Sequence, residues 1–515
     1  MVTMKRTGSF AFISILFALN TSAQNKVTVQ ADSGKFIINK NIYGHFSEHL
    51  GHCIYEGIYV GDNNKSIPNT NGIRNDVINA LKKLKVPLLR WPGGCFADTY
   101  HWKDGVGPKN KRASIVNQWW GGVTEDNSFG THEFLNFCKM IGAEPYISGN
   151  VGSGTVQEMT DWVSYVNGAS AASPMSKWRV KNGQSEPWHA QYWGVGNEAW
   201  GCGGSMTPEH YADIYRQYAT YLTDVNNTKI FRIASGASGD DTHWTEVLMK
   251  NIPLNMLQGI GVHHYAVIDW GKKGSAINFS EAEYFATMKE ALKMEEIVSR
   301  HAAIMDKYDP QKKVTMAVDE WGGWYDVEQG TNPGFLFQQN TMRDAVLAGA
   351  TLNIFNNHCE RVRMANLAQM VNVLQAVILT NKEKLILTPT YHVMEMYNVH
   401  QDATMLPVKV ETEDYVFEND KLPAISASAS KDKNGITHIS LTNVDASKSK
   451  EVIIELKGGN YKKISGRILT SNKLQSYNSF DEPNKIQPTA LNVHINDNKV
   501  VIKIPAFSVV VLAVE

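Results

Sequence analysis

Two short apolar runs of this chain each end in a glutamate: residues 191–198 read QYWGVGNE, and residues 314–321 read VTMAVDEW. Their length and their content of valine, tryptophan and tyrosine predict buried strands. A strand end is a rigid platform, so Glu198 and Glu320 are each expected to be held in a fixed position. If the two strands belong to one parallel sheet, both carboxylates face the same edge of it.

Further runs of this kind alternate with amphipathic stretches from about residue 42 to residue 390. Eight strands, each followed by a helix, predict a (β/α)₈ TIM barrel whose catalytic face lies at the carboxyl ends of the strands. A doubly wound sheet is the alternative, but the number of repeats favours the barrel. The predicted strands end near Ser47, Trp91, Ser148, Asn197, Ser235, His264, Glu320 and Asn356.

After residue 394 the helical periodicity stops and alternating strands begin, separated by turns such as Lys433-Asn434-Gly435. This pattern predicts an accessory all-β sandwich domain. The predicted organisation is a signal peptide over residues 1–23, a strand within 24–41 that joins the sandwich, a catalytic barrel over 42–393 and the sandwich over 394–515.

The N-terminus has the composition of a signal peptide. Lys5 and Arg6 precede a mostly apolar run over residues 10–19, and Thr21-Ser22-Ala23 resembles a cleavage site. The run is too short for a permanent membrane span. These features predict an exported protein, periplasmic or secreted, without a membrane anchor.

Charge and cysteine content exclude several classes of protein. The chain has 50 basic and 51 acidic residues, so it lacks the excess positive charge that a nucleic-acid partner requires. Five scattered cysteines form neither a disulfide framework nor a metal-binding spacing, and at least one must stay free. We expect no metal and no cofactor. The cysteines are Cys53, Cys95, Cys138, Cys202 and Cys359.

Two carboxylates on facing strands suit glycoside hydrolysis, which divides the work between two carboxyl groups. Glu198 is predicted to be the general acid/base and Glu320 the nucleophile. The alternatives are a Glu198 that caps the next helix and a Glu320 that only pairs a barrel arginine. Asn197, beside Glu198, is expected to bind a sugar hydroxyl.

Other polar residues at predicted strand ends are candidates for substrate binding. Glu48 would hold hydroxyls or form an ion pair with Arg90, and Arg90 would orient acidic groups or touch substrate. His263 and Tyr265 end the sixth predicted strand. Gln369 falls at an apolar helix start and shows no functional pattern of its own.

Six motifs, in order along the chain, resemble those of glycoside hydrolase family 51, the α-L-arabinofuranosidases. The motifs are IYGHFSEHL at 42–50, RWPGG at 90–94, DGVGP at 104–108, GNE at 196–198, DEW at 319–321 and ANLAQMVN at 365–372. The resemblance implies a barrel beside a β-sandwich, a retaining mechanism, and substrate contacts by Glu48, Arg90, Asn197, His263, Tyr265 and Gln369. It also implies homo-oligomers, which no surface pattern supports independently.

One departure concerns the sugar site. The family pattern Gly-Gly-Asn-Phe reads Gly93-Gly94-Cys95-Phe96 here, so Cys95 replaces a polar side chain expected to contact substrate.

The predicted activity is the exo-acting release of terminal α-L-arabinofuranosyl units from an arabinose-containing oligo- or polysaccharide. The alternatives are another retaining glycosidase on the same barrel, such as an endo-glucanase or β-xylosidase, and a carbohydrate-binding protein without catalysis.

Overall fold

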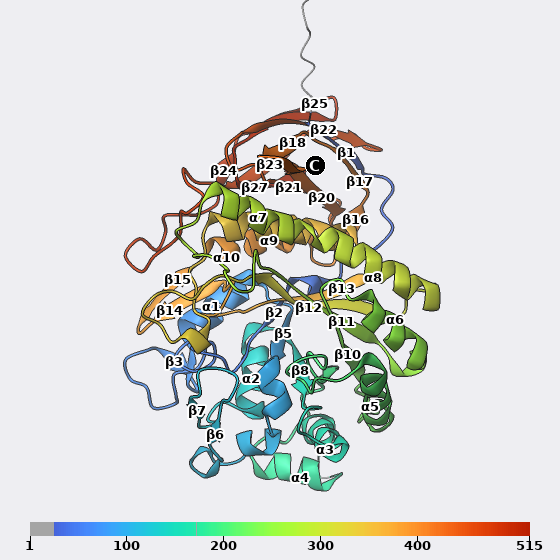
Figure 1. Cartoon of the computed structure of the whole chain (residues 1–515), viewed down its shortest axis with the longest axis vertical. Coiled ribbons are helices and arrows are strands. Elements are labelled where there is room, and N and C mark those ends of the chain that lie inside the picture. The colour runs from blue at the N-terminus through green and yellow to red at the C-terminus, as the bar shows by residue number, and fades with distance from the viewer. Residues whose placement is uncertain (1–24, 171) are drawn as a thin grey trace, which may run out of the picture.

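The computed structural model describes residues 25–170 and 172–515, and the signal peptide predicted over residues 1–23 lies outside them. Eight parallel strands close into a barrel in which each strand pairs with the next one in chain order, as Figure 1 shows. The predicted barrel is therefore confirmed. Its strands are β2 (Gly44–Phe46), β5 (Leu88–Trp91), β8 (Glu144–Gly149), β9 (Tyr192–Val195), β10 (Phe231–Ser238), β11 (Gly259–Ala266), β12 (Thr315–Gly323) and β13 (Val362–Leu367).

Helices follow the barrel strands and cover the outside of the barrel (Figure 1). Several begin with a Ser or Thr side chain that accepts a hydrogen bond from the first turn, as Thr207 does from the His210 N–H in α5. The helices are α1 (Asn75–Leu84), α2 (Thr131–Ile141), α3 (Val156–Asn167), α4 (Pro174–Lys181), α5 (Pro208–Tyr221), α6 (Thr242–Asn251), α7 (Glu281–Leu292), α8 (Met294–Tyr308), α9 (Met342–Asn357) and α10 (Pro389–Tyr397).

A small apolar cluster fills the barrel interior. Leu88, Tyr146, Ile233, Ala317 and Met364 come from five different strands and are all buried. Side chains contributed by several strands in this way make the barrel a packed core instead of a pore. The rigid interior fixes the strand ends above it, where the polar residues lie.

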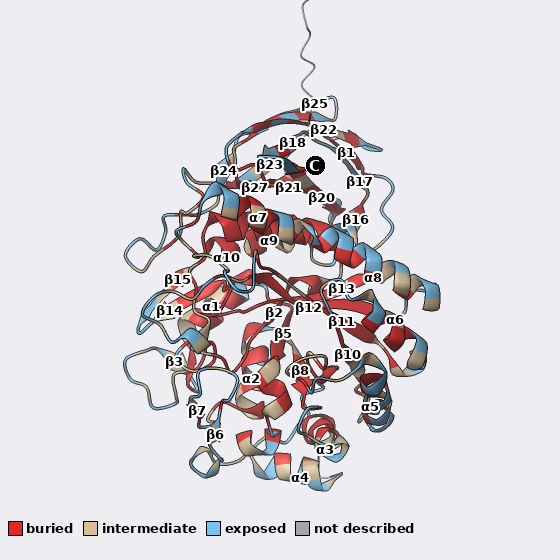
Figure 2. Ribbon diagram, in the orientation of Figure 1, coloured by how far each residue is buried: buried red, intermediate tan, exposed pale blue. Residues whose placement is uncertain are grey.

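The prediction of a strand ending near Asn356 is wrong. Asn356 lies in α9, and the eighth strand is β13, which ends at Leu367 just before Gln369. Every residue of α9 from Met342 to Asn356 is buried, as the red ribbon in Figure 2 shows. A helix buried on all sides has no polar face, so its sequence lacks the helical period and reads as a buried strand.

Two sheets form the sandwich, one ordered β17-β1-β22-β26-β25 and the other β16-β20-β21-β27-β23-β24. Strand β1 (Asn25–Gln30), near the N-terminus, pairs in parallel with β22 (Lys450–Lys457) and antiparallel with β17 (Val408–Glu411). The other strands are β16 (Thr404–Leu406), β20 (Ile425–Lys431), β21 (Thr437–Asn443), β23 (Ile464–Leu469), β24 (Thr489–Leu491), β25 (Ile495–Asn496), β26 (Lys499–Ile504) and β27 (Ser508–Val514).

Helix α9 joins the two parts of the molecule, because it packs against barrel strand β12 on one side and against β20, β21 and β27 on the other. No helix in the described part of the chain combines the length and apolar character that crossing a membrane requires.

Candidate active site

Glu320 and Arg90 form a buried ion pair at the mouth of the barrel. Arg90 Nη1 donates to Glu320 Oε1 at 2.8 Å, and Arg90 Nη2 donates to Asn197 Oδ1 at 2.6 Å. The Tyr265 hydroxyl donates to the second oxygen of Glu320 at 2.9 Å. Both oxygens of Glu320 therefore accept charge-assisted or hydroxyl hydrogen bonds, which hold the carboxyl group in one orientation. Arg90 does not pair with Glu48.

Glu198 follows β9 and faces a different environment. Its Oε1 lies 2.9 Å from His263 Nδ1, and its side chain is 18% exposed against 7% for Glu320. Burial raises the pKa of Glu198; the His263 contact lowers it in part, and the charge of Glu320 raises it further. Thr207, not Glu198, caps the following helix α5, which excludes the capping alternative. A raised pKa and partial exposure suit a carboxyl group that exchanges protons.

His263 lies between three carboxylates. Its Nδ1 contacts Glu198 and, at 3.5 Å, Glu320 Oε2, while its Nε2 lies 3.3 Å from Asp319 Oδ1. Burial alone would lower the pKa of His263, but Glu320 and the two other carboxylates hold it at about 10. One potential metal-ligand atom from each of Glu198, His263 and Glu320 lies within 4.8 Å of the other two. A protonated ring has no lone pair to offer, so this group is a poor site for a metal.

Glu48, after β2, is surrounded by hydrogen-bond donors. Gln369 Nε2 donates to its Oε2 at 2.6 Å, and the Gly94 N–H and the Trp120 indole donate to its Oε1 at 2.9 and 3.0 Å. Burial and the charge of Glu320 raise the pKa of Glu48 to about 7. The structure thus brings Gln369, which has no sequence pattern of its own, into the same site as Glu48.

Trp120 and Asp98 complete the site, and the sequence analysis assigned no role to either residue. Trp120 lies in the long loop after β5, whose length and tryptophans indicate a functional loop but no particular contact. Asp98 accepts the backbone N–H groups of Val151, Gly152 and Asn197 at 2.7, 2.8 and 2.9 Å. No sequence signal marks Asp98, because its partners come from two other strand ends.

The prediction about the cysteines needs a correction, because Cys95 and Cys202 form a disulfide. Cys53, Cys138 and Cys359 are free and buried. The bonded pair is 107 residues apart in sequence, and only the closed barrel brings the loops after β5 and β9 together. Cys202 Sγ lies 3.6 Å and Cys95 Sγ 4.0 Å from Glu198 Oε2. A disulfide sulfur carries no proton, so neither sulfur donates a hydrogen bond to Glu198.

These groups face a small cavity of about 50 Å³. Its polar lining comes from Glu48, Asn197, Glu198, Glu320 and Gln369. Leucine and aromatic side chains close its sides: Leu50, Trp120, Tyr265, Trp324, Leu336 and Leu374.

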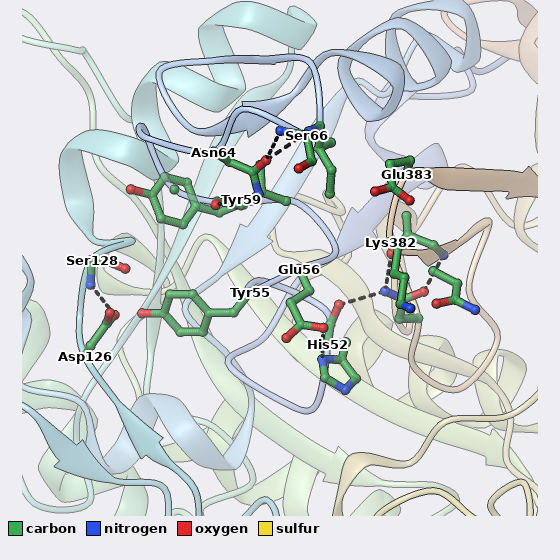
Figure 3. A pocket seen from close by; sticks show the side chains of 16 residues that line it. His52, Tyr55, Glu56, Tyr59, Asn64, Ser66, Asp126, Ser128, Lys382 and Glu383 are labelled. Atoms are coloured by element: carbon green, nitrogen blue, oxygen red, sulfur yellow. Dashed lines mark hydrogen bonds and ion pairs between the residues drawn. The ribbon is translucent and has the colours of Figure 1, made fainter.

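A larger cavity of about 760 Å³, drawn in Figure 3, is built by other parts of the same loops. In it Tyr55 points toward Asp126, and His52 lies beside Glu56 at 3.3 Å. Its acidic residues do not form a pair: Glu56 contacts His52, Asp126 accepts the Ser128 N–H, and Glu383 is exposed to solvent. The smaller cavity is therefore the candidate active site despite its size.

Comparisons with known proteins agree with this geometry. Residues 80–304 match the Alpha-L-arabinofuranosidase 1 domain, and residues 319–508 match the Alpha-L-arabinofuranosidase C-terminal domain. An "Intracellular exo-alpha-L-arabinofuranosidase" from Bacteroides ovatus is 52% identical over 98% of this chain and 99% of its own length. The GH51 arabinofuranosidase of Xanthomonas axonopodis pv. citri is 46% identical, covers 96% of this chain and 100% of its own, and superimposes with a TM-score of 0.94. A Thermotoga maritima α-L-arabinofuranosidase solved with arabinose is 30% identical, with 95% and 99% covered and a TM-score of 0.82.

The prediction of an exported protein is contradicted by the Bacteroides ovatus relative, whose name describes an intracellular enzyme. A basic start and a short apolar run are compositional signals only, and composition does not establish that an export machinery reads them.

Proposed function

We propose that this chain, which belongs to the α-L-arabinofuranosidases of glycoside hydrolase family 51, releases terminal α-L-arabinofuranosyl residues from arabinose-containing glycans by a retaining mechanism. The observation that carries this is the pair of unlike carboxyl groups in one small cavity. Glu320 is bound by the Arg90 guanidinium and by the Tyr265 hydroxyl, whereas Glu198 contacts His263 and its pKa is raised by burial. Two carboxyls with different environments can take the two different roles.

In the first step Glu320 attacks the anomeric carbon while Glu198 protonates the departing oxygen, which gives a glycosyl ester on Glu320. In the second step Glu198 takes a proton from water, the water attacks the anomeric carbon, and the ester bond breaks. One oxygen of each carboxyl group lies within 4.8 Å of the other. Retaining enzymes hold their carboxyl groups about 5–5.5 Å apart and inverting enzymes about 6.5–9.5 Å apart, so this proximity supports retention.

The other predicted residues would bind the sugar in this mechanism or orient the residues that do. Glu48 and Asn197 offer acceptor and donor atoms to hydroxyl groups, and Gln369 positions Glu48 through its 2.6 Å hydrogen bond. Arg90 binds Glu320 and Asn197 and so orients both without being aimed at the substrate. Cys95 lines the cavity as part of the disulfide, so it would give the sugar an apolar contact and no hydrogen bond.

Exo action is supported by the Bacteroides ovatus relative, whose name describes an exo-acting enzyme, and by the small volume of the cavity. An endo-glucanase would require an open groove. A binding protein without catalysis would have no need for the different environments of Glu198 and Glu320. Homo-oligomerisation is a separate prediction, and light scattering of the purified chain would test it.

Replacing the proposed nucleophile tests the assignment directly. We expect Glu320→Ala to abolish turnover of an aryl arabinofuranoside, and added azide to restore part of it by giving a glycosyl azide of inverted configuration. Wild-type rates in this variant would contradict the nucleophile assignment.

The proposed acid is tested by the choice of leaving group. Glu198→Ala is expected to slow substrates with poor leaving groups by about 10²–10⁴-fold, and those with good leaving groups much less, because the latter need little protonation. Equal losses on both kinds of substrate would argue against Glu198 as the acid.

A further inference from the structure

The Cys95–Cys202 disulfide is in contact with the proposed acid. One ligand atom each from Cys95, Glu198 and Cys202 lies within 4.8 Å of the other two. The mechanism above uses neither sulfur. Two sulfurs and a carboxylate are a ligand set that Zn²⁺ and other soft or borderline divalent cations prefer, once the sulfurs are reduced.

We propose that reduction of this disulfide creates a binding site for a zinc-like divalent cation, with Cys95, Cys202 and Glu198 as ligands, and that the bound cation inhibits the enzyme by occupying its acid. Binding of the cation does not depend on the proposed function, whereas the expected inhibition rests on the proposed role of Glu198 as the acid.

The distances fit such a site with little movement. In a tetrahedral zinc site, sulfur–sulfur separations are about 3.8 Å and sulfur–oxygen separations about 3.5 Å. The two sulfurs already lie 3.6 and 4.0 Å from Glu198 Oε2. Only the sulfurs must separate after reduction, and their Cα atoms, 5.4 Å apart, leave room for this by side-chain rotation.

Neighbouring groups already orient the future ligands. His263 Nδ1 contacts Glu198 Oε1, the oxygen that would not bind the cation, at 2.9 Å. Asn197 Nδ2 approaches Cys202 Sγ at 3.7 Å and would donate to a thiolate there. Such partners fix the geometry of metal ligands and strengthen binding. The fourth position would be taken by water from the cavity.

The chemistry has two balanced steps. Two equivalents of a small thiol reduce the disulfide to the Cys95 and Cys202 thiols and are themselves oxidised to one external disulfide. Zn²⁺ then replaces the two thiol protons, which are released to solvent, and binds the Glu198 carboxylate. Both cysteines are partly exposed, and Cys95 lines the cavity, so reductant and cation have access.

A metal-bound Glu198 cannot deliver a proton to the leaving group. Because general acid catalysis contributes about 10²–10⁴-fold, zinc should lower the turnover of the reduced enzyme by about 100-fold or more on substrates with poor leaving groups. Chelation should reverse the loss. The oxidised enzyme should be insensitive to the same zinc concentration.

Cobalt provides a readout that is independent of activity. The full chain is reduced with a thiol, desalted without oxygen, checked for its fold by circular dichroism and titrated with Co²⁺. We expect sulfur-to-cobalt charge-transfer absorption that saturates near about one equivalent and is bleached by Zn²⁺. The oxidised protein and Cys202→Ser should lack the band, and Glu198→Gln should weaken cobalt binding by about tenfold or more.

Cys138→Ala is the matched control, because Cys138 is a free, buried cysteine of α2, outside the site. It should keep both the band and the zinc response. A reduced, folded protein without the band would overturn the proposal, as would equal cobalt binding by the oxidised form or by Cys202→Ser. A cobalt band without any loss of activity would leave the site standing but contradict the role of Glu198 as the acid.

Discussion

His263 contacts both of the catalytic glutamates proposed above. It contacts Glu198 at 2.9 Å and Glu320 at 3.5 Å, and its own pKa of about 10 keeps it protonated at neutral pH. A fixed positive charge beside Glu198 favours the ionised form of that acid and opposes the effect of burial. His263 therefore lowers the pH above which Glu198 can no longer donate a proton, against the larger effect of burial.

Removing this charge should shift the pH profile of catalysis. In His263→Ala the pKa of Glu198 rises, so the basic limb of kcat/KM should move to higher pH, because Glu198 stays protonated longer. The measurement is kcat/KM against pH with a slow leaving group. Tyr265→Phe is the control, since Tyr265 donates to Glu320 and not to Glu198. A basic limb that moves down, or moves equally in both variants, would contradict this coupling.

Trp120 is expected to act on substrate affinity through Glu48. Trp120→Phe keeps an aromatic wall but removes the indole N–H that lies 3.0 Å from Glu48 Oε1. Loss of one hydrogen bond to a charged group is worth about 1.5–3 kcal/mol, so kcat/KM should fall about tenfold or more. Unchanged kinetics would mean that this hydrogen bond does not support substrate binding.

At the scale of single elements, the 3₁₀ turn η2 (Cys95–Thr99) holds neighbouring loops of the site in place. Its Asp98 accepts three backbone N–H groups that belong to the ends of β8 and β9, including the N–H of Asn197. A carboxylate with three backbone donors fixes loops that no regular element holds.

The neutral replacement Asp98→Asn should lower both stability and activity. An amide has one oxygen and must leave at least one buried N–H without a partner, which costs about 1–3 kcal/mol. We expect a lower urea midpoint and a reduced kcat with the fold retained. If stability fell but kcat did not, Asp98 would support the loops without positioning Asn197.

The sequence predicts strands well where an apolar run ends in a polar residue. It placed Glu198 and Glu320 on strand ends because short, bounded apolar runs read directly as buried strands. It failed at α9, whose full burial removes the helical period. The residue pattern did not mark Gln369 either, because its role depends on Glu48 from a loop far away in the sequence, and only the family resemblance indicated it. The Cys95–Cys202 disulfide was not predicted for the same reason, because two cysteines 107 residues apart in the sequence meet only in the closed barrel.

At the scale of the whole molecule, α9 makes the barrel and the sandwich depend on each other. Asn353 in α9 donates to Ser426 and accepts from Ser428 of the sandwich at 3.2 and 2.8 Å. At Gly349 a side chain would meet Thr442 Oγ1 at 2.7 Å and Val509 at 3.1 Å, so the helix packs directly on the sheet there. We infer that the two parts unfold together.

Gly349→Val tests this coupling without touching the site. Overpacking should destabilise the protein by about 1–3 kcal/mol and lower the melting temperature, while kcat at low temperature is unchanged. Circular dichroism and residual activity should report one transition. Two separate transitions would contradict a single cooperative unit.

The most direct test of the proposed function is hydrolysis of an aryl α-L-arabinofuranoside, with aryl β-xyloside and β-glucoside alongside, followed by proton NMR. We predict fast release of arabinose from the first substrate alone, with the α-anomer formed first. Formation of the β-anomer first would contradict the retaining roles of Glu198 and Glu320. Hydrolysis of only the xyloside or glucoside would contradict the proposed substrate.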